Sequence, residues 1–64
     1  MKSDAVILQI AAEMIEEHGS EAVRAAIEFA NLMLDLGERD RQVEWLRVRT
    51  AIVLLRDNRL RQPQ

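Results

Sequence analysis

The sequence lacks cysteine, and its 64 residues include one histidine, one proline, two glycines and two aromatic residues. Without cysteine the chain has neither disulfides nor thiolate ligands, and a single histidine leaves too few ligands for a structural zinc site built by this chain alone. Chains this short bury only about 60% of the surface that they expose when unfolded, so they are marginal as isolated monomers. Oligomerisation and close helix packing remain as sources of stability.

The sequence also lacks the patterns that carry catalysis or nucleotide binding. It contains no glycine-rich phosphate loop, no Glu-x-x-His and no His-Glu-x-x-His motif. Glu13, Glu16 and Glu17 are candidates for acid–base work, but helical spacing places them together on a polar face, where a solvated surface is the simpler interpretation. We therefore expect a non-enzymatic protein with no cofactor, no metal and no small-molecule substrate.

Long hydrophobic runs are missing as well. Nothing approaches the roughly 18 continuous apolar residues of a transmembrane helix, and the first residues do not form the apolar core of a signal peptide. The net charge of −2 gives no reason to expect nucleic acid or an anionic membrane as a partner. We expect a cytoplasmic protein without a membrane partner.

Apolar residues, at 48% of the chain, recur with the 3.6-residue period of helices, and no segment shows the strict alternation of a strand. The sequence predicts a single all-α domain over residues 1–64, a three-helix bundle with short glycine hinges. The expected helices cover about 4–18, 20–36 and 39–59, and residues 60–64 form a tail.

Particular residues mark where these helices begin and end. Ser3 and Ser20 are expected N-caps of the first two helices, and Asp40 is a possible cap of the third. Gly19 and Gly37 follow the first and second helices, where a left-handed backbone suits glycine.

The apolar faces of the first two helices are wider than a small monomer needs. Each spans roughly 200°, against the 100° or so of an ordinary surface helix. The expected line of the first helix is Ile7, Ile10, Ala11, Met14 and His18. The expected centre of the second is Ala22, Ala25, Phe29, Leu32, Met33 and Leu36, flanked by Ala26, Ile27, Ala30 and Leu34.

The third helix has two apolar stripes that face different directions. One is Trp45, Val48, Ile52 and Leu55; the other is Leu46, Val53 and Leu60, extended by Val43. Two stripes require two neighbours, so we expect a homodimer that acts as a small interaction, adaptor or regulatory module. The predicted interface residues are Phe29, Met33, Leu46, Val53 and Leu60.

Basic residues concentrate in the second half of the chain. Residues 1–32 carry two basic and six acidic side chains, and residues 33–64 carry seven basic and five acidic ones. The candidate nucleic-acid or ion-pair contacts are Arg47, Arg49, Arg56 and Arg59. The alternative function is a dimeric, helix-turn-helix-like DNA-binding regulator that uses the third helix. Ion pairs between the acidic helices of one chain and the basic helix of another remain open, as does a separate protein partner folded against the third helix.

Two single residues have more than one interpretation. His18, the only histidine, could act as a base, a pH sensor or a ligand, but its place in the last turn of a helix favours contact with the final carbonyl groups. Trp45 is interpreted as core rather than as an interface anchor.

The segment from His18 to Leu55 resembles a family of short, uncharacterised bacterial helical proteins. The shared pattern reads here as His18-Gly19, Ala22, Ala26, Ala30, Gly37, Trp45, Val48, Ala51-Ile52 and Leu55. Glu38 stands where aspartate is usual, which shifts the expected cap toward Asp40, and Val48 stands where isoleucine is common. The resemblance implies no activity. It implies that His18, both glycines and Trp45 belong to one structural unit.

Overall fold

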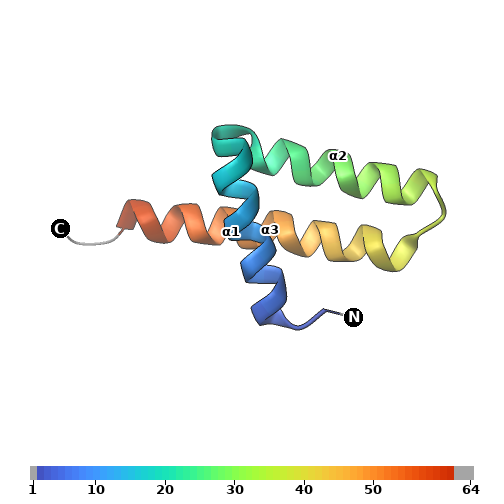
Figure 1. Ribbon diagram of the computed structural model, residues 1–64, viewed down its shortest axis with the longest axis horizontal. Coiled ribbons are helices and arrows are strands. Elements are labelled where there is room, and N and C mark those ends of the chain that lie inside the picture. Colours follow the sequence, from blue (N-terminus) through green and yellow to red (C-terminus); the bar gives the residue numbers. More distant parts are fainter. Residues whose placement is uncertain (1, 62–64) are drawn as a thin grey trace.

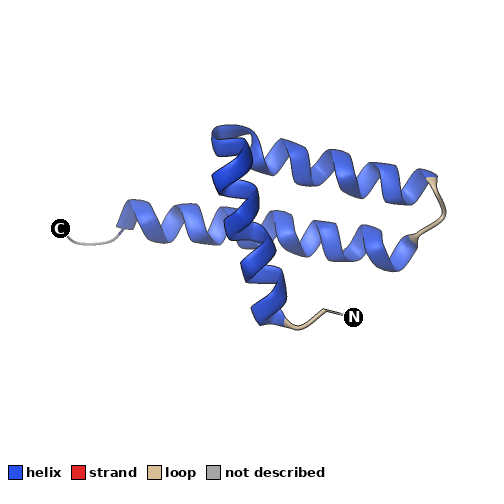
Figure 2. Cartoon of the chain, viewed as in Figure 1, coloured by secondary structure: helices blue, strands red, loops and turns tan. Residues whose placement is uncertain are grey.

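The computed structural model describes residues 2–61 of the chain and the side chains of residues 2–57. Its elements are α1 (Asp4–His18), the 3₁₀ turn η1 (Gly19–Glu21), α2 (Ala22–Asp35) and α3 (Arg39–Arg61). Within residues 2–61 the regular structure is all helix, with no strand (Figure 2). The prediction of an all-α fold is confirmed.

The helices form a flat, elongated molecule with extents of 45 × 23 × 15 Å. Because α1, η1 and α2 follow one another without a break, they make one long bent run that packs against α3 (Figure 1). Helices α2 and α3 lie side by side and antiparallel, and α1 crosses α3 and joins the start of α2. The arrangement is therefore less clearly a bundle of three separate helices than the sequence predicted.

The first helix begins where the sequence predicted. The Ser3 hydroxyl accepts a hydrogen bond from the Val6 backbone N–H at 3.3 Å, which satisfies one of the donors left without a partner at a helix start. At the other end Gly19 has φ 55° and ψ −126°, a conformation open essentially to glycine alone. Its N–H still bonds the carbonyl of Ile15, so the chain bends while the ladder of hydrogen bonds continues.

The expected Ser20 cap is wrong. Ser20 lies inside η1, and the residue that precedes α2 is Glu21, which makes no side-chain capping bond. The reason is that the 3₁₀ turn already supplies an acceptor, because the N–H of Ala22 bonds the carbonyl of Gly19.

Helix α2 ends in a Schellman motif around Gly37, which has φ 76°. The Gly37 N–H bonds the Leu34 carbonyl at 3.0 Å, and the Glu38 N–H bonds the Met33 carbonyl at 2.8 Å. The left-handed cap predicted at this glycine is confirmed.

Helix α3 begins one residue before the proposed cap. Its first residue is Arg39, and the N–H of Gln42 bonds the carbonyl of Glu38 at 2.9 Å. Glu38 therefore holds the N-cap position, and the expected Asp40 cap is wrong because Asp40 lies in the first turn. The helix continues to Arg61 rather than to residue 59, and residues 62–64 of the predicted tail lie outside the described residues.

The core is built mainly from alanine. Among the side chains of residues 2–57, five of the nine buried residues are alanines, and only Ile52 and Val48 are larger side chains with almost no exposed surface. The full set is Ile7, Ala11, Met14, Ala22, Ala26, Ala30, Val48, Ala51 and Ile52. The predicted core stripe of α3 is confirmed, since Trp45 and Leu55 pack against this cluster.

The predicted centre of the apolar face of α2 is wrong. The buried line is Ala22, Ala26 and Ala30, which the sequence placed partly at the flank, while Leu32 and Leu36 are exposed. The physical reason is the close approach of crossing helices, whose axial separation depends on the side chains at the contact. Small side chains allow the backbones to meet there.

Candidate interaction surfaces

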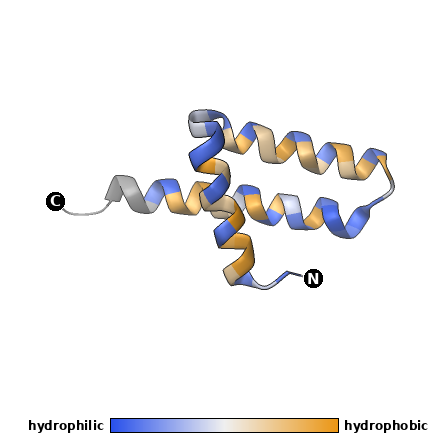
Figure 3. Cartoon of the chain, viewed as in Figure 1, coloured by the Kyte–Doolittle hydropathy of each residue, from blue (hydrophilic) through white to orange (hydrophobic). Residues whose placement is uncertain are grey.

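Leucine, the usual core residue of a helical protein, stays outside this core. Among the side chains of residues 2–57, five leucines are exposed, two are partly exposed and none is buried. Leu36 keeps 64% of its surface exposed and Leu54 keeps 57%. Figure 3 shows hydrophobic residues along nearly all of α2 and along the first half of α1. The chain therefore presents apolar surface that its own fold does not cover.

One apolar groove lies where α1, α2 and α3 meet. Its volume is about 380 Å³, and its floor includes the stacked rings of Phe29 and Trp45. The ring centroids are 4.7 Å apart with 25° between the planes, a stacked geometry that adds to simple burial. The other lining residues are Lys2, Ile7, Ile10, Leu32, Met33, Arg41, Glu44 and Val48.

A second groove of about 480 Å³ runs between α1 and α3. Leu8 of α1 and Leu54 of α3 are both exposed along it, and Arg47 and Arg49 contribute positive charge. The remaining lining residues are Asp4, Ile7, Val43, Leu46, Thr50 and Ala51.

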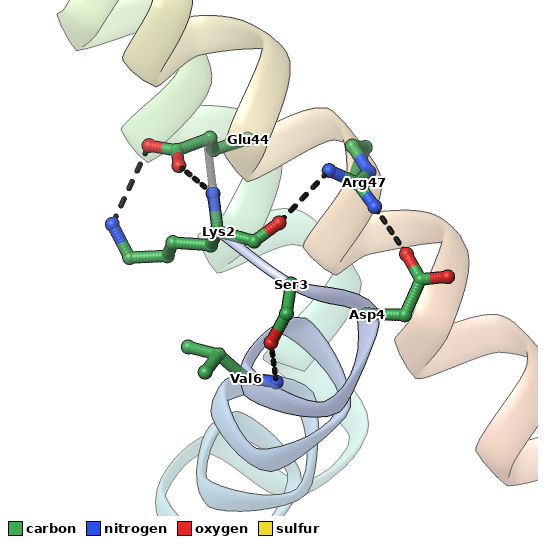
Figure 4. A network of polar contacts seen from close by, with 6 residues as sticks. All are labelled: Lys2, Ser3, Asp4, Val6, Glu44 and Arg47. Carbon is green, nitrogen blue, oxygen red and sulfur yellow. Dashed lines mark hydrogen bonds and ion pairs between the residues drawn. The ribbon is translucent and has the colours of Figure 1, made fainter.

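Polar contacts fix the start of α1 on α3 (Figure 4). The Lys2 backbone N–H donates to Glu44 Oε2 at 3.0 Å, and the Lys2 ammonium lies 3.4 Å from Glu44 Oε1. Arg47 donates to the Lys2 carbonyl at 3.3 Å and forms an ion pair with Asp4. These contacts join residues more than forty positions apart, so they set the position at which α1 crosses α3.

Within this network Glu44 contacts Lys2, and only 15% of its side chain is exposed. The hydrogen bond from the Lys2 backbone lowers the pKa of Glu44 below its ordinary value near 4.5, with help from the positive charge of Lys2 and against the effect of burial. The ionised carboxylate is therefore the form that favours the contact between Lys2 and α3.

The candidate arginines separate into different environments. Arg47 is engaged with α1, so it serves an intramolecular ion pair rather than an open surface. Arg49 is exposed and Arg56 is partly exposed on α3, and the side chain of Arg59 lies outside the described residues. Helices α2 and α3 run antiparallel, whereas the helices of a helix-turn-helix cross at about 90–120°. The DNA-binding alternative gains no support from this geometry and stays a prediction.

The predicted interface residues lie on two helices and border different grooves. Phe29 and Met33 lie on α2 beside the first groove, Leu46 lines the second groove, and Val53 is exposed on α3. The side chain of Leu60 lies outside the described residues.

His18 is exposed at the end of α1, and its Nε2 atom lies 3.9 Å from Glu17 Oε2. It also borders a shallow third groove of about 470 Å³ along α2, together with Glu21 and Glu28. Among the described residues no three potential metal ligands gather in one place.

Two features of these surfaces were not predicted from the sequence. The groove between α1 and α3 combines Leu8 with Leu54, and helical periodicity cannot pair residues on different helices. The stacking of Phe29 on Trp45 likewise depends on how α2 and α3 are aligned. The four-residue steps between the alanines of α2 were a usable signal for a closely packed helix, and these are the residues that the structure buries.

None of the helices in the described part of the chain combines the length and the apolar character that crossing a membrane requires. No family model, curated protein or solved structure matches this chain. The resemblance to short bacterial helical proteins therefore stays a prediction.

Proposed function

We propose that this chain is a non-enzymatic helical interaction module, an adaptor or regulator that acts as a homodimer of three-helix bundles. Its working surface lies among the apolar side chains that the fold leaves outside the core. A further protein partner would bind through the same kind of helix surface.

The observation that carries the proposal is that small alanine side chains occupy the core while larger leucine side chains remain exposed. Within the described side chains, alanines make up five of the nine core residues, while five leucines remain exposed. Burying one leucine side chain contributes about 1.5–3 kcal/mol to the free energy of folding. The five exposed leucines therefore leave a large part of this stabilisation unused. A second molecule covering these side chains would recover part of that free energy.

The shape of the molecule supports the same conclusion. Helix α1 covers only part of the α2–α3 hairpin (Figure 1). Where α1 does not cover them, α2 and α3 form a single layer of helices (Figure 1). Helical layers bury their apolar sides against another layer, and a partner would supply it here.

Sedimentation velocity over about 5 to 500 μM chain concentration tests the proposal. We expect the mass to change from monomer to dimer within this range, with unchanged helical content by circular dichroism. A single monomeric species at the highest concentration would refute self-association.

A further inference from the structure

Two stripes on opposite halves of the α2–α3 hairpin have heptad spacing, and they are apolar except for Thr50. The α2 seam consists of Ala25, Phe29, Leu32 and Leu36, and the α3 seam consists of Val43, Leu46, Thr50 and Val53. Each follows alternating steps of three and four residues, the pattern by which two helices pack along their length. Most of these side chains remain exposed, and Phe29 keeps 37% of its surface exposed even while it stacks on Trp45.

A row of like charges borders each seam at seven-residue spacing. Glu21, Glu28 and Asp35 follow the α2 seam, and Arg49 and Arg56 follow the α3 seam. Seven residues of helix correspond to about 10.5 Å, so successive charges in the two rows have matching separations. Arg24 and Asp57 carry the opposite sign near the respective rows but do not share their spacing.

Among the side chains of residues 2–57 these charges form no ion pair. Within residues 2–57 the ion pairs involve Lys2, Asp4, Glu17, His18, Glu44 and Arg47, and none involves a member of either row. Pairing two α2 seams would place carboxylates against carboxylates, and pairing two α3 seams would place arginines against arginines. Like charges facing each other disfavour both arrangements.

We propose that the α2 seam of one copy packs antiparallel against the α3 seam of a second copy, with the acidic row opposite the arginine row. This inference rests on the proposed self-association and specifies its contact. In heptad notation the seam residues occupy positions a and d, and both charged rows occupy position g. Antiparallel helices bring the two g rows together. Because every copy carries both seams, a two-fold dimer forms the contact twice.

Charge reversal with complementation tests the contact. One variant combines Glu28→Lys and Asp35→Lys, and the other combines Arg49→Glu and Arg56→Glu. A matched control, Glu13→Lys with Glu16→Lys, makes the same change of charge on the exposed side of α1. Dissociation constants come from sedimentation in about 50 mM salt, for each protein alone and for the equimolar mixture of the two variants.

We expect each reversed variant to dissociate roughly 30-fold more readily than the wild type, because attraction becomes repulsion in both copies of the contact. The equimolar mixture restores the wild-type constant to within about threefold, since acid again meets base on both sides. The control stays near wild type. In about 1 M salt, where charges are screened beyond about 3 Å, the differences shrink.

A second pair of variants tests the apolar side of the same contact. Leu32 and Leu34 are 48% and 49% exposed on one helix, but two residues of helix rotate them about 200° apart. Only Leu32 belongs to the α2 seam. Leu32→Gln should weaken association roughly tenfold, and Leu34→Gln should leave it unchanged.

The outcomes separate the two proposals. A wild type that stays monomeric refutes the proposed function. A wild-type dimer that tolerates both reversals, or a mixture that fails to recover, refutes the α2–α3 contact while self-association stands. If a reversed variant loses helical content, two neutral variants replace it: Glu28→Gln with Asp35→Asn, and Arg49→Gln with Arg56→Gln. Each should also weaken association, but less than the charge reversal does. Equal behaviour of Leu32→Gln and Leu34→Gln would also count against this contact.

Discussion

Phe29 of α2 stacks on Trp45 of α3, with ring centroids 4.7 Å apart. These are the two aromatic residues of the chain, and they meet in the part of the hairpin that lies beside α1. The contact joins a residue predicted for the interface to one predicted for the core. It therefore links the alignment of the hairpin to the surface that we propose for association.

Replacing Phe29 by alanine should destabilise the fold as well as the dimer. The loss of a partly buried ring and of its stacking partner predicts a decrease of about 1–3 kcal/mol in the free energy of unfolding. Urea unfolding followed by the fluorescence of Trp45 measures this, and the emission should shift to longer wavelength. Phe29→Leu keeps apolar bulk and should lose about 1 kcal/mol or less. Unchanged stability in Phe29→Ala would mean that this ring serves the interface alone.

The two glycines should respond differently to alanine. A Cβ at either position meets nothing within 4 Å, so any cost comes from the backbone conformation. The φ and ψ of Gly19 exclude other residues, and Gly19→Ala should cost about 1–3 kcal/mol. Gly37→Ala should cost about 1 kcal/mol, and Gly37→Asn less, because asparagine tolerates the left-handed cap. Thermal unfolding ranks the variants, and a Gly19→Ala protein as stable as the wild type would contradict the bend described for η1.

Ala26 tests whether close helix packing depends on small side chains. It has no exposed surface, so Ala26→Leu should overpack the junction of the three helices and cost about 1–3 kcal/mol. Ala12 is exposed on α1, and Ala12→Leu is the matched control with little expected effect. Calorimetric unfolding at one protein concentration compares the two. If Ala26→Leu and Ala12→Leu were equally stable, the core would have space for a larger side chain at position 26, contrary to the structure.

Glu44 should make the stability depend on pH in the acid range. Its pKa in the folded protein lies below the ordinary value near 4.5, so the unfolded chain binds the proton more readily. The stabilising contribution is fully present above that ordinary value and is lost as the pH falls through the lower folded pKa. Urea midpoints of the wild type and Glu44→Gln should differ at pH 7 and converge toward pH 3. A difference that stays constant over this range would contradict the role given to the ionised carboxylate.

The local features of the fold could be read from the sequence because each depends on a few neighbouring residues. Ser3 caps α1, Gly19 and Gly37 take positive φ, and Val48 and Ile52 are buried as predicted. Ser20 and Asp40 were wrongly predicted as caps because backbone hydrogen bonds from the preceding turn set the start of each helix. Backbone hydrogen bonds do not depend on the side chain, so the sequence does not reveal them.

The residue pattern alone specifies the all-helical class, because the apolar residues recur with a 3.6-residue period and no segment alternates as a strand does. The pattern also shows more apolar residues than one small core can use. The packing of the helices selects which apolar residues remain outside the core. Periodicity ranks the faces of a helix by hydrophobicity, and it favoured the line through Phe29, Leu32 and Leu36. The packing of α2 against α3 instead selects side chains by size, so Ala22, Ala26 and Ala30 are buried while Leu32 and Leu36 remain exposed.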